Sequence, residues 1–132
     1  MTVEVFTLCD FAQDNLGKLT IIGAFDTLSV KDFPAVHPYM CVAARIRFAV
    51  YELGDHAIRV DIRSPEGEAL VPALEGSMSV NGIGKDSACA NLTLNLINVR
   101  WAKHGSWNIA LSIDGLERAH IPLYVRKAPA QR

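Results

Sequence analysis

The chain has 132 residues, of which 50% are apolar and 20% are charged, and its formal net charge at pH 7 is −1. This composition excludes a disordered polypeptide, and the near-neutral charge excludes a general electrostatic attraction to nucleic acid or to a membrane surface. The length suits one domain built around a single core.

The N-terminal segment MTVEVFTLCDFAQDN has no basic start, and Glu4 and Asp10 interrupt its apolar run, so it does not resemble a secretory signal peptide. No stretch of the sequence approaches the roughly 20 apolar residues that a membrane-spanning helix needs. Three cysteines lie within apolar alternations, which favours buried, reduced thiols over disulfides: Cys9, Cys41 and Cys89. We therefore expect a cytoplasmic protein with one domain over 1–126 and a frayed tail over 127–132.

Apolar and polar residues alternate through almost the whole chain, and turn-forming residues interrupt the alternation about every ten residues. A period of two is typical of strands in an antiparallel sandwich or barrel. We predict an all-β fold, an antiparallel β-sandwich of immunoglobulin-like type with roughly eight to nine strands. The strands are expected at 3–10, 18–30, 39–51, 56–64, 68–72, 75–81, 88–97 and, as a hairpin of two strands, 106–126.

The first two strands flank the turn Asn15-Leu16-Gly17-Lys18, and three aspartates lie near it. If Asp10, Asp14 and Asp26 come together, they can bind a cation or form a carboxylate pair, and the alternative function is then a small cation-dependent hydrolase. Aspartates at turns and strand ends more often serve the backbone of the turn. Cys9 beside Asp10 is a further candidate nucleophile, although a thiol in an apolar strand is normally inert.

The next two strands are predicted to form a hairpin around the turn 53–55. Because residues paired across an antiparallel ladder point to the same face, this register collects apolar residues of both strands on the inner face. The pairs are Val50 with Ile58, Phe48 with Val60, and Ile46 with Ile62.

The same register places four arginines on the outer face of this hairpin, with Arg47 opposite Asp61 and Arg45 opposite Arg63. Guanidinium groups hold carboxylates and phosphates through paired hydrogen bonds, so the patch is predicted to bind an acidic partner or an anionic ligand. The alternative is an ordinary solvated sheet face with one cross-strand ion pair. The candidate binding residues are Arg45, Arg47, Arg59 and Arg63.

The segment ACANLTLNLI directs its alanine and leucines inward and a neutral polar row outward: Asn91, Thr93 and Asn95. That row suggests a carbohydrate-binding module as another alternative, although it lacks the aromatic platforms on which sugars stack. The preceding SVNGIGKD lacks the residues of a phosphate-binding loop and is predicted to be a connection. Ser77 and Ser79 would extend the polar surface if their strand is a neighbour.

The four histidines show no pair at metal-ligand spacing, and no CxxC motif is present, so no metal or cofactor is predicted. They are His37, His56, His104 and His120. Trp101, Lys103 and His104 precede the last hairpin, where an exposed aromatic residue and a cation would suit a ligand. The favoured interpretation is that Trp101 closes the end of the sandwich.

The closing stretch SWNIALSIDGLERAHIPLYV alternates on both sides of Asp114-Gly115. A plain two-residue loop would put its two apolar rows on opposite faces. One additional residue, in a three-residue loop or in a bulge between Leu116 and His120, pairs Ile109 with Ile121 and Trp107 with Leu123. We therefore predict a bulged hairpin whose apolar face contacts a second sheet.

Three stretches, CDFAQDNLGKLTIIGAFD, GEALVPALEGSMSV and GSWNIALSIDG followed by IPLYV, resemble a family of bacterial proteins of about this length. The family is classed only as a domain of unknown function, so the resemblance implies no catalytic or binding residues. The closing pattern is also similar to that of immunoglobulin-like domains.

The preferred hypothesis is a non-catalytic cytoplasmic binding or assembly module that uses the arginine patch. A protein partner is expected, and neither nucleic acid nor a membrane is. Because exposed edge strands invite pairing between copies, a homodimer is a further expectation.

Overall fold

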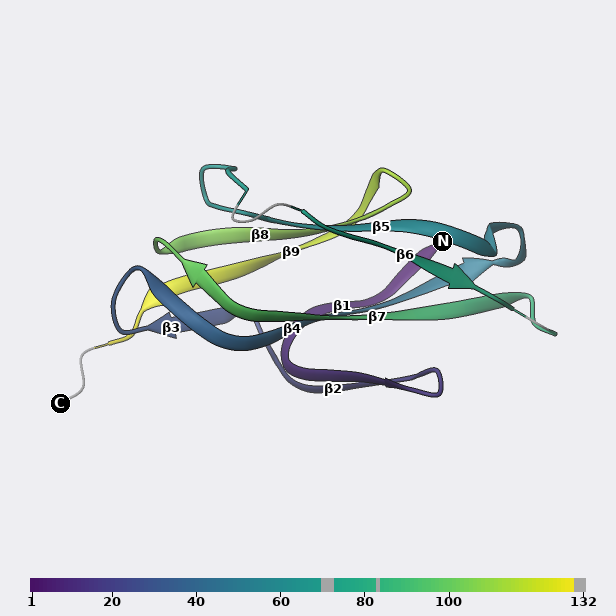
Figure 1. Ribbon diagram of the computed structural model, residues 1–132, viewed down its shortest axis with the longest axis horizontal. Coiled ribbons are helices and arrows are strands. Elements are labelled where there is room, and N and C mark those ends of the chain that lie inside the picture. Colours follow the sequence, from purple (N-terminus) through teal and green to yellow (C-terminus); the bar gives the residue numbers. More distant parts are fainter. Residues whose placement is uncertain (70–72, 83, 130–132) are drawn as a thin grey trace.

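The computed structural model describes residues 1–69, 73–82 and 84–129, which form an all-β sandwich of two sheets (Figure 1). The first sheet has four strands in the order β2 (Lys18–Phe25), β1 (Thr2–Asn15), β4 (Ala35–Ala49) and β7 (Ser87–Trp101). The second has five, in the order β3 (Thr27–Val30), β9 (Leu116–Lys127), β8 (Gly105–Ile113), β5 (Gly54–Arg63) and β6 (Leu74–Val80). All pairs are antiparallel except β3 with β9. The predicted all-β class and the sandwich of roughly eight to nine strands are therefore confirmed.

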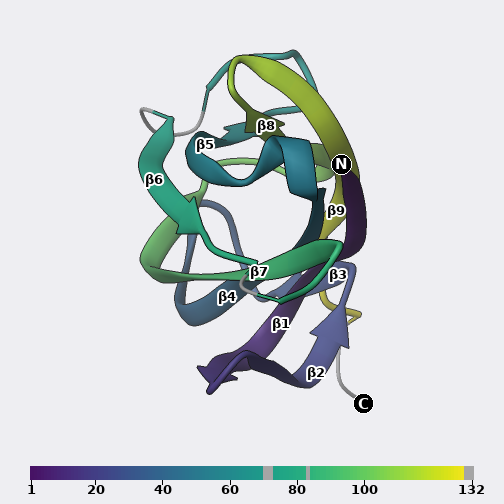
Figure 2. The ribbon, with the colours of Figure 1, turned by 90° about the vertical axis from the view of Figure 1, so that its right-hand side faces the viewer.

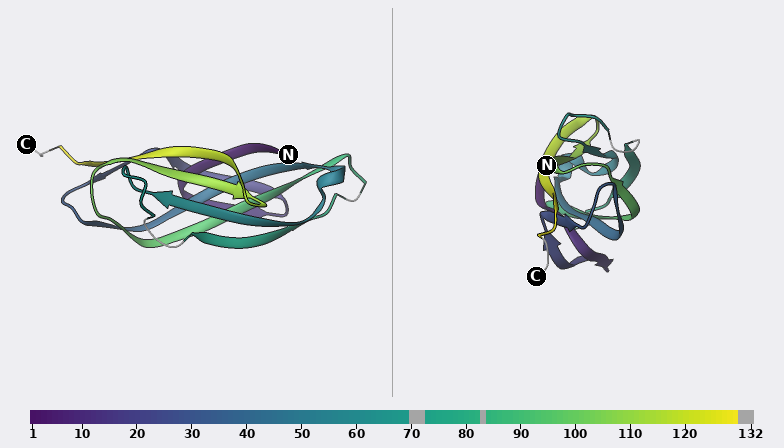
Figure 3. Two further views of the ribbon diagram at one scale, coloured as in Figure 1. Left: turned by 90° about the horizontal axis from the view of Figure 1, so that it is seen from above. Right: turned by 90° about the vertical axis from the view of Figure 1, so that its left-hand side faces the viewer.

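The core lies between the two sheets, where the alternating apolar residues of both inner faces meet. Figure 3 shows that the molecule is elongated along the strand direction. Trp101 is fully buried, and its ring meets the Trp107 ring edge-on, with 5.0 Å between the ring centroids. The prediction that Trp101 closes one end of the core is therefore confirmed.

The last hairpin has the predicted register, with Trp107 opposite Leu123 and Ile109 opposite Ile121. Its turn is the two-residue Asp114-Gly115, and both residues have positive φ, as the turn of a tight hairpin requires. The additional residue is accommodated by a register shift next to Leu111. The bulge thus restores one common apolar face for both strands.

The predicted hairpin between residues 39–51 and 56–64 is wrong. β4 pairs with β1 and β7, whereas β5 pairs with β8 and β6 in the other sheet. A short 3-10 turn, η1 (Val50–Glu52), carries the chain across. The Glu52 carboxylate fixes this turn by accepting hydrogen bonds from the Ala49 N–H at 2.9 Å and from the N-terminal ammonium group at 2.8 Å. Ile46, Phe48 and the inner residues of β5 are still buried, because both sheets face the same core.

Several predicted boundaries change. The expected strand 18–30 is divided between β2 and β3, which belong to different sheets. The expected strand 68–72 includes residues 70–72, which lie outside the described residues. The expected tail begins later, because Lys127 ends β9 and the Ala128 N–H donates a 2.7 Å hydrogen bond to the Val30 carbonyl. Residues 130–132 lie outside the described part of the chain.

The β1–β2 hairpin folds back over the outer face of the first sheet (Figures 1 and 2). We call this hairpin the arm. Its bend lies where Asp10 meets Gly23, whose φ is +69° and whose missing Cβ would lie 2.3 Å from the Asp10 carboxylate. The arm covers a small second core, and all three cysteines are free thiols, with Cys9 and Cys41 fully buried and Cys89 half-buried. Among the described residues, no helix is long and apolar enough to cross a membrane.

Candidate functional site

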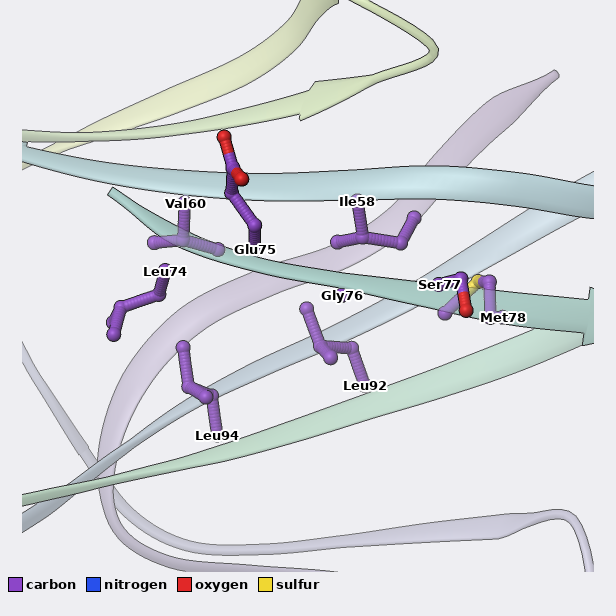
Figure 4. Close-up of a pocket in the computed structure, with 9 residues that line it drawn as sticks. All are labelled: Ile58, Val60, Leu74, Glu75, Gly76, Ser77, Met78, Leu92 and Leu94. Carbon is purple, nitrogen blue, oxygen red and sulfur yellow. The ribbon is translucent and has the colours of Figure 1, made fainter. Parts of the chain in front are cut away.

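An apolar cleft lies on the side of the sandwich where β6 and β7, the edge strands of the two sheets, run next to each other (Figures 2 and 4). Its volume is about 180 Å³. Leu92 and Leu94 point from β7 toward β6, and Ile58 and Val60 of β5 form the back of the cleft (Figure 4). The remaining lining residues belong to β6: Leu74, Glu75, Gly76, Ser77 and Met78.

The cleft exists because β6 lacks one inward side chain. Leu74, Met78 and Val80 alternate toward the core, and Gly76 takes the inward position between Leu74 and Met78. No atom of the described residues lies within 4 Å of the position where a Cβ would stand on Gly76. Glycine weakens a strand because it has no side chain to pack. A glycine in a strand interior therefore often marks a place where a ligand or another backbone approaches closely.

The edge of β7 beside the cleft carries no charge over 87–99. Natural proteins usually keep edge strands short, or they protect them against pairing with charged residues, proline or bulges. The other three edge strands have such features: β3 is short, β2 contains Lys18 and the twisted Gly23, and β6 contains Glu75. In the described structure, β7 is the longest edge strand and the least protected against pairing.

The charged groups near the cleft lie on its rim. Glu75 pairs with Arg59 at 3.3 Å on the outer face of the second sheet, and both side chains are exposed. The side chains that point into the cleft are hydrocarbon or thioether groups. An occupant therefore gains from apolar contact in the cleft and from backbone hydrogen bonds along β7.

The four predicted binding arginines do not form one patch, which is a consequence of the wrong β4–β5 pairing. Arg45 and Arg47 lie on the outer face of the first sheet, opposite Asn91 and Cys89 of β7. Arg59 and Arg63 lie on β5, in the other sheet. The predicted pairs Arg47 with Asp61 and Arg45 with Arg63 are therefore absent from the described structure.

Each pair of arginines shares a carboxylate instead. Glu4 sits at a bulge in β1, where its carboxylate lies 3.1 Å from Arg45 Nε and 2.6 Å from Arg47 Nε. The hydrogen bond from Arg47 is the main reason that the pKa of Glu4 lies below its ordinary value. On β5, Asp61 lies 3.1 Å from Arg59 Nε and 3.8 Å from Arg63 Nη2. These pairs give two partly neutralised faces in place of one anion-binding surface.

The three aspartates proposed for a cation site serve separate places. Asp10 lies at the bend of the arm, Asp14 accepts a 2.7 Å hydrogen bond from Asn91 Nδ2, and Asp26 accepts one from the neighbouring Thr27 hydroxyl. Across the described residues, no three metal-binding side chains form a group that could hold an ion. Cys9 is buried, and this burial raises its pKa to about 11, which opposes a role as a nucleophile.

The polar row of β7 points outward as predicted, but the arm occupies part of it. Asn91 Nδ2 also donates to the Gly17 carbonyl at the tip of the arm, and Asn95 Oδ1 accepts from the Tyr39 hydroxyl at 2.9 Å. Ser77 and Ser79 do not continue the row, because β6 belongs to the other sheet. Asn91 therefore holds the tip of the arm, and the side-chain oxygen of Asn95 is engaged by the neighbouring strand β4.

The sequence interpretation missed Gly76 as a functional candidate. A signal was present, since LEGSMSV places a glycine where alternation calls for an inward apolar residue. The uncharged run of β7 was equally visible. Neither signal could show that the two segments lie side by side at open edges of different sheets, because that depends on strand order.

The family described as "Family of unknown function (DUF6941)" matches residues 4–126. None of the curated proteins compared with the chain matches it. The matched region includes every strand that forms the cleft and all four arginines. The chain therefore belongs to the DUF6941 family.

Proposed function

We propose that the protein is a non-catalytic binding module that captures an extended apolar polypeptide segment by adding it as a strand to β7. In this recognition mode, backbone hydrogen bonds at a sheet edge supply affinity, and a pocket for alternate side chains supplies specificity. One observation carries the proposal: the uncharged edge of β7 runs directly beside an apolar cleft that Gly76 leaves open.

The size of the cleft restricts its occupant. A dry apolar cavity of about 150 Å³ can hold a benzene molecule, and this cleft has about 180 Å³. It therefore suits one bulky apolar side chain, such as leucine or phenylalanine. The neighbouring side chains of the bound strand would point outward, so we propose a segment in which apolar and polar residues alternate.

The corrected positions of the arginines argue against the predicted acidic partner or anionic ligand. Each guanidinium group already contacts a carboxylate of its own sheet, so an anion would have to compete with Glu4 or Asp61. The three free thiols support a reducing compartment, and we propose that the module works in the cytoplasm.

Filling the cleft from within tests this function. Gly76→Val adds an apolar side chain at a position that has no described atom within 4 Å, and valine favours a strand. We expect the free energy of unfolding to rise by about 1 kcal/mol. We also expect about tenfold or greater loss of affinity for a synthetic lysine-flanked peptide of alternating leucine and threonine, because one side chain of that peptide loses its site.

Ser79→Val is the matched control. It adds the same side chain to the same strand, but on the exposed outer face, and it should leave the affinity for the peptide unchanged. Fluorescence anisotropy measures the peptide affinity, and urea unfolding measures the stability. Equal affinity in Gly76→Val and the unmodified protein would overturn the proposed function.

A further inference from the structure

We propose that the strand added to β7 is β7 of a second copy, antiparallel to the first, with the two-fold axis passing beside Leu92. This inference rests on the proposed strand-addition site and names its occupant. It is carried by the pattern of residues along β7, which complements itself when one copy is reversed.

The inner face of β7 grows from small to large along the strand: Ala88, Ala90, Leu92, Leu94, Leu96. Antiparallel pairing about Leu92 sets each alanine of one copy opposite a leucine of the other, namely Ala88 with Leu96 and Ala90 with Leu94. Small residues therefore meet large ones on both sides of the central Leu92–Leu92 pair, and this allows close packing between the copies.

The outer face is also compatible with its own reversed copy. The pairs are Ser87 with Ile97, Cys89 with Asn95, and Asn91 with Thr93, so no like charges are brought together. Asn98 has a φ of +53°, and the β4–β7 register skips it between the pairs Val99 with His37 and Ile97 with Tyr39, so the regular part of the edge ends at Ile97. Reversal about Leu92 is the register that pairs the whole regular edge, from Ser87 to Ile97, with itself.

The second copy also covers apolar surface that one copy leaves exposed. Leu92 of the second copy faces the cleft beside Gly76, and it supplies the bulky side chain that the cleft suits. Leu16, at the tip of the arm, is 96% exposed and lies near Ala88 and Cys89. This is the end of β7 that receives Ile97 of the second copy, and Ile97 is itself 65% exposed.

The contact area is sufficient for a stable dimer. The regular edge of β7 spans roughly 35 Å at the usual rise per residue of a strand, and both sheets end on this side of the sandwich. Two stacked sheets with their outer side chains are about 20 Å thick, so each copy buries on the order of 700 Å². Specific interfaces typically bury about 800 Å² per partner.

A disulfide between two variants tests the register. Ser87→Cys and Ile97→Cys are purified separately, mixed, allowed to exchange subunits, and oxidised with glutathione disulfide, whose reduction to two glutathione molecules accompanies formation of the protein disulfide. Residues directly opposite each other in an antiparallel pair lie within disulfide distance. We expect a covalent dimer joining positions 87 and 97 in the mixture, and none in either variant alone.

Analytical ultracentrifugation of the unmodified protein accompanies this test. A dimer that forms no disulfide between positions 87 and 97 would overturn the inference, because its interface would lie elsewhere. A monomer at all concentrations would overturn it as well. In that second case, weaker peptide binding by Gly76→Val would still support the proposed function, so the two failures are distinguishable.

Discussion

His56 joins two connections that lie far apart in the sequence. Its ring stacks on Phe48 with 4.4 Å between the ring centroids, Nδ1 lies 2.6 Å from Asp114 Oδ2, and Nε2 lies 2.5 Å from the Glu52 carbonyl oxygen. The hydrogen bond with Asp114 raises the pKa of His56, and the same bond lowers the pKa of Asp114. The charged pair therefore ties η1 to the turn between β8 and β9.

These two pKa shifts predict a pH window of stabilisation. Because folding raises the pKa of His56, the pair contributes its full stabilisation at pH values below the pKa of His56 in the unfolded chain, near 6.5. This stabilisation is lost as the pH rises through the pKa of His56 in the folded protein. Because folding lowers the pKa of Asp114, the stabilisation from its charged form is present at pH values above the pKa of Asp114 in the unfolded chain, near 3.8. It is lost as the pH falls through the pKa of Asp114 in the folded protein. The pair should therefore stabilise the fold most between about pH 4 and pH 6.5.

Asp114→Asn tests this prediction, because asparagine tolerates the positive φ of the turn and can still accept the hydrogen bond from the Ala57 N–H. Urea unfolding should show a larger loss of stability for the variant at pH 5.5 than at pH 8.5. Glu117→Gln is a control, since it removes the contact of an exposed carboxylate with the exposed His120. An equal loss for Asp114→Asn at both pH values would contradict the predicted charge on His56.

At the scale of single residues, the sequence predicts burial more reliably than contacts. Alternation identified Trp107, Ile109 and Leu96 correctly as buried. It also placed Leu92 and Leu94 on the inner face, where the open edge leaves them half-buried. The partners of Arg45 and Arg63 were wrong, because an ion pair depends on which strands are neighbours. Burial follows from local periodicity, whereas pairing follows from topology.

Among the elements, the arm is the one that the alternation could not predict. Cys9 and Ala12 belong to the same buried cluster although they are three residues apart, so the strict period of two is broken between them. The cause is the bend at Asp10, which requires glycine at position 23 of the partner strand. The alternation predicts a plain hairpin here, whereas the bent hairpin in the structure covers the outer face of the first sheet.

The hydrogen bond between Asp14 and Asn91 should control how often the arm opens. Cys41 is fully buried beneath the arm, and burial raises its pKa, so its thiol should react slowly with iodoacetamide. Asp14→Ala removes a contact of about 1 kcal/mol at the tip. We expect about fivefold faster alkylation of Cys41, measured by mass spectrometry, with little change in global stability.

Asp26→Ala is the matched control for the arm, because the carboxylate of Asp26 bonds only its neighbour Thr27 in the described structure. Alkylation of Cys41 should keep its original rate in this variant. Equal rates in Asp14→Ala and the unmodified protein would mean that another contact, such as Arg45 with the Gly17 carbonyl, holds the tip.

The β4–β5 connection is a second element whose geometry the alternation could not predict. Pairing two consecutive strands by parity gave a consistent apolar face, and both strands do contribute to the core. Two strands in facing sheets satisfy the same parity as two strands in one sheet, because both present alternate residues to a shared interior. The short turn η1, fixed by Glu52, decides between them, and its geometry was not visible in the alternation.

For the whole molecule, the arrangement of edges has a thermodynamic consequence. β6 and β7 end the two sheets on the same side (Figure 2), and half-buried apolar residues, among them Leu74, Met78, Leu92 and Leu94, cover the core there. If a second copy closes this side, folding and association are coupled. The midpoint of thermal unfolding, Tm, should then rise by about 2–3 °C for each tenfold increase in protein concentration, as expected for a dimer of this chain length.

Ile97→Lys should abolish this dependence of Tm on concentration. Ile97 is 65% exposed on the outer face of β7, so lysine there costs one copy little, but the two-fold symmetry introduces the charge twice into the proposed interface. Ile22→Lys makes the same change on β2, opposite Phe11, at a site that is 56% exposed and lies outside the proposed interface, and it should keep the dependence. Calorimetry of both variants over a range of concentrations separates the two outcomes. A dependence that persists in Ile97→Lys and disappears in Ile22→Lys would move the interface from β7 to the arm.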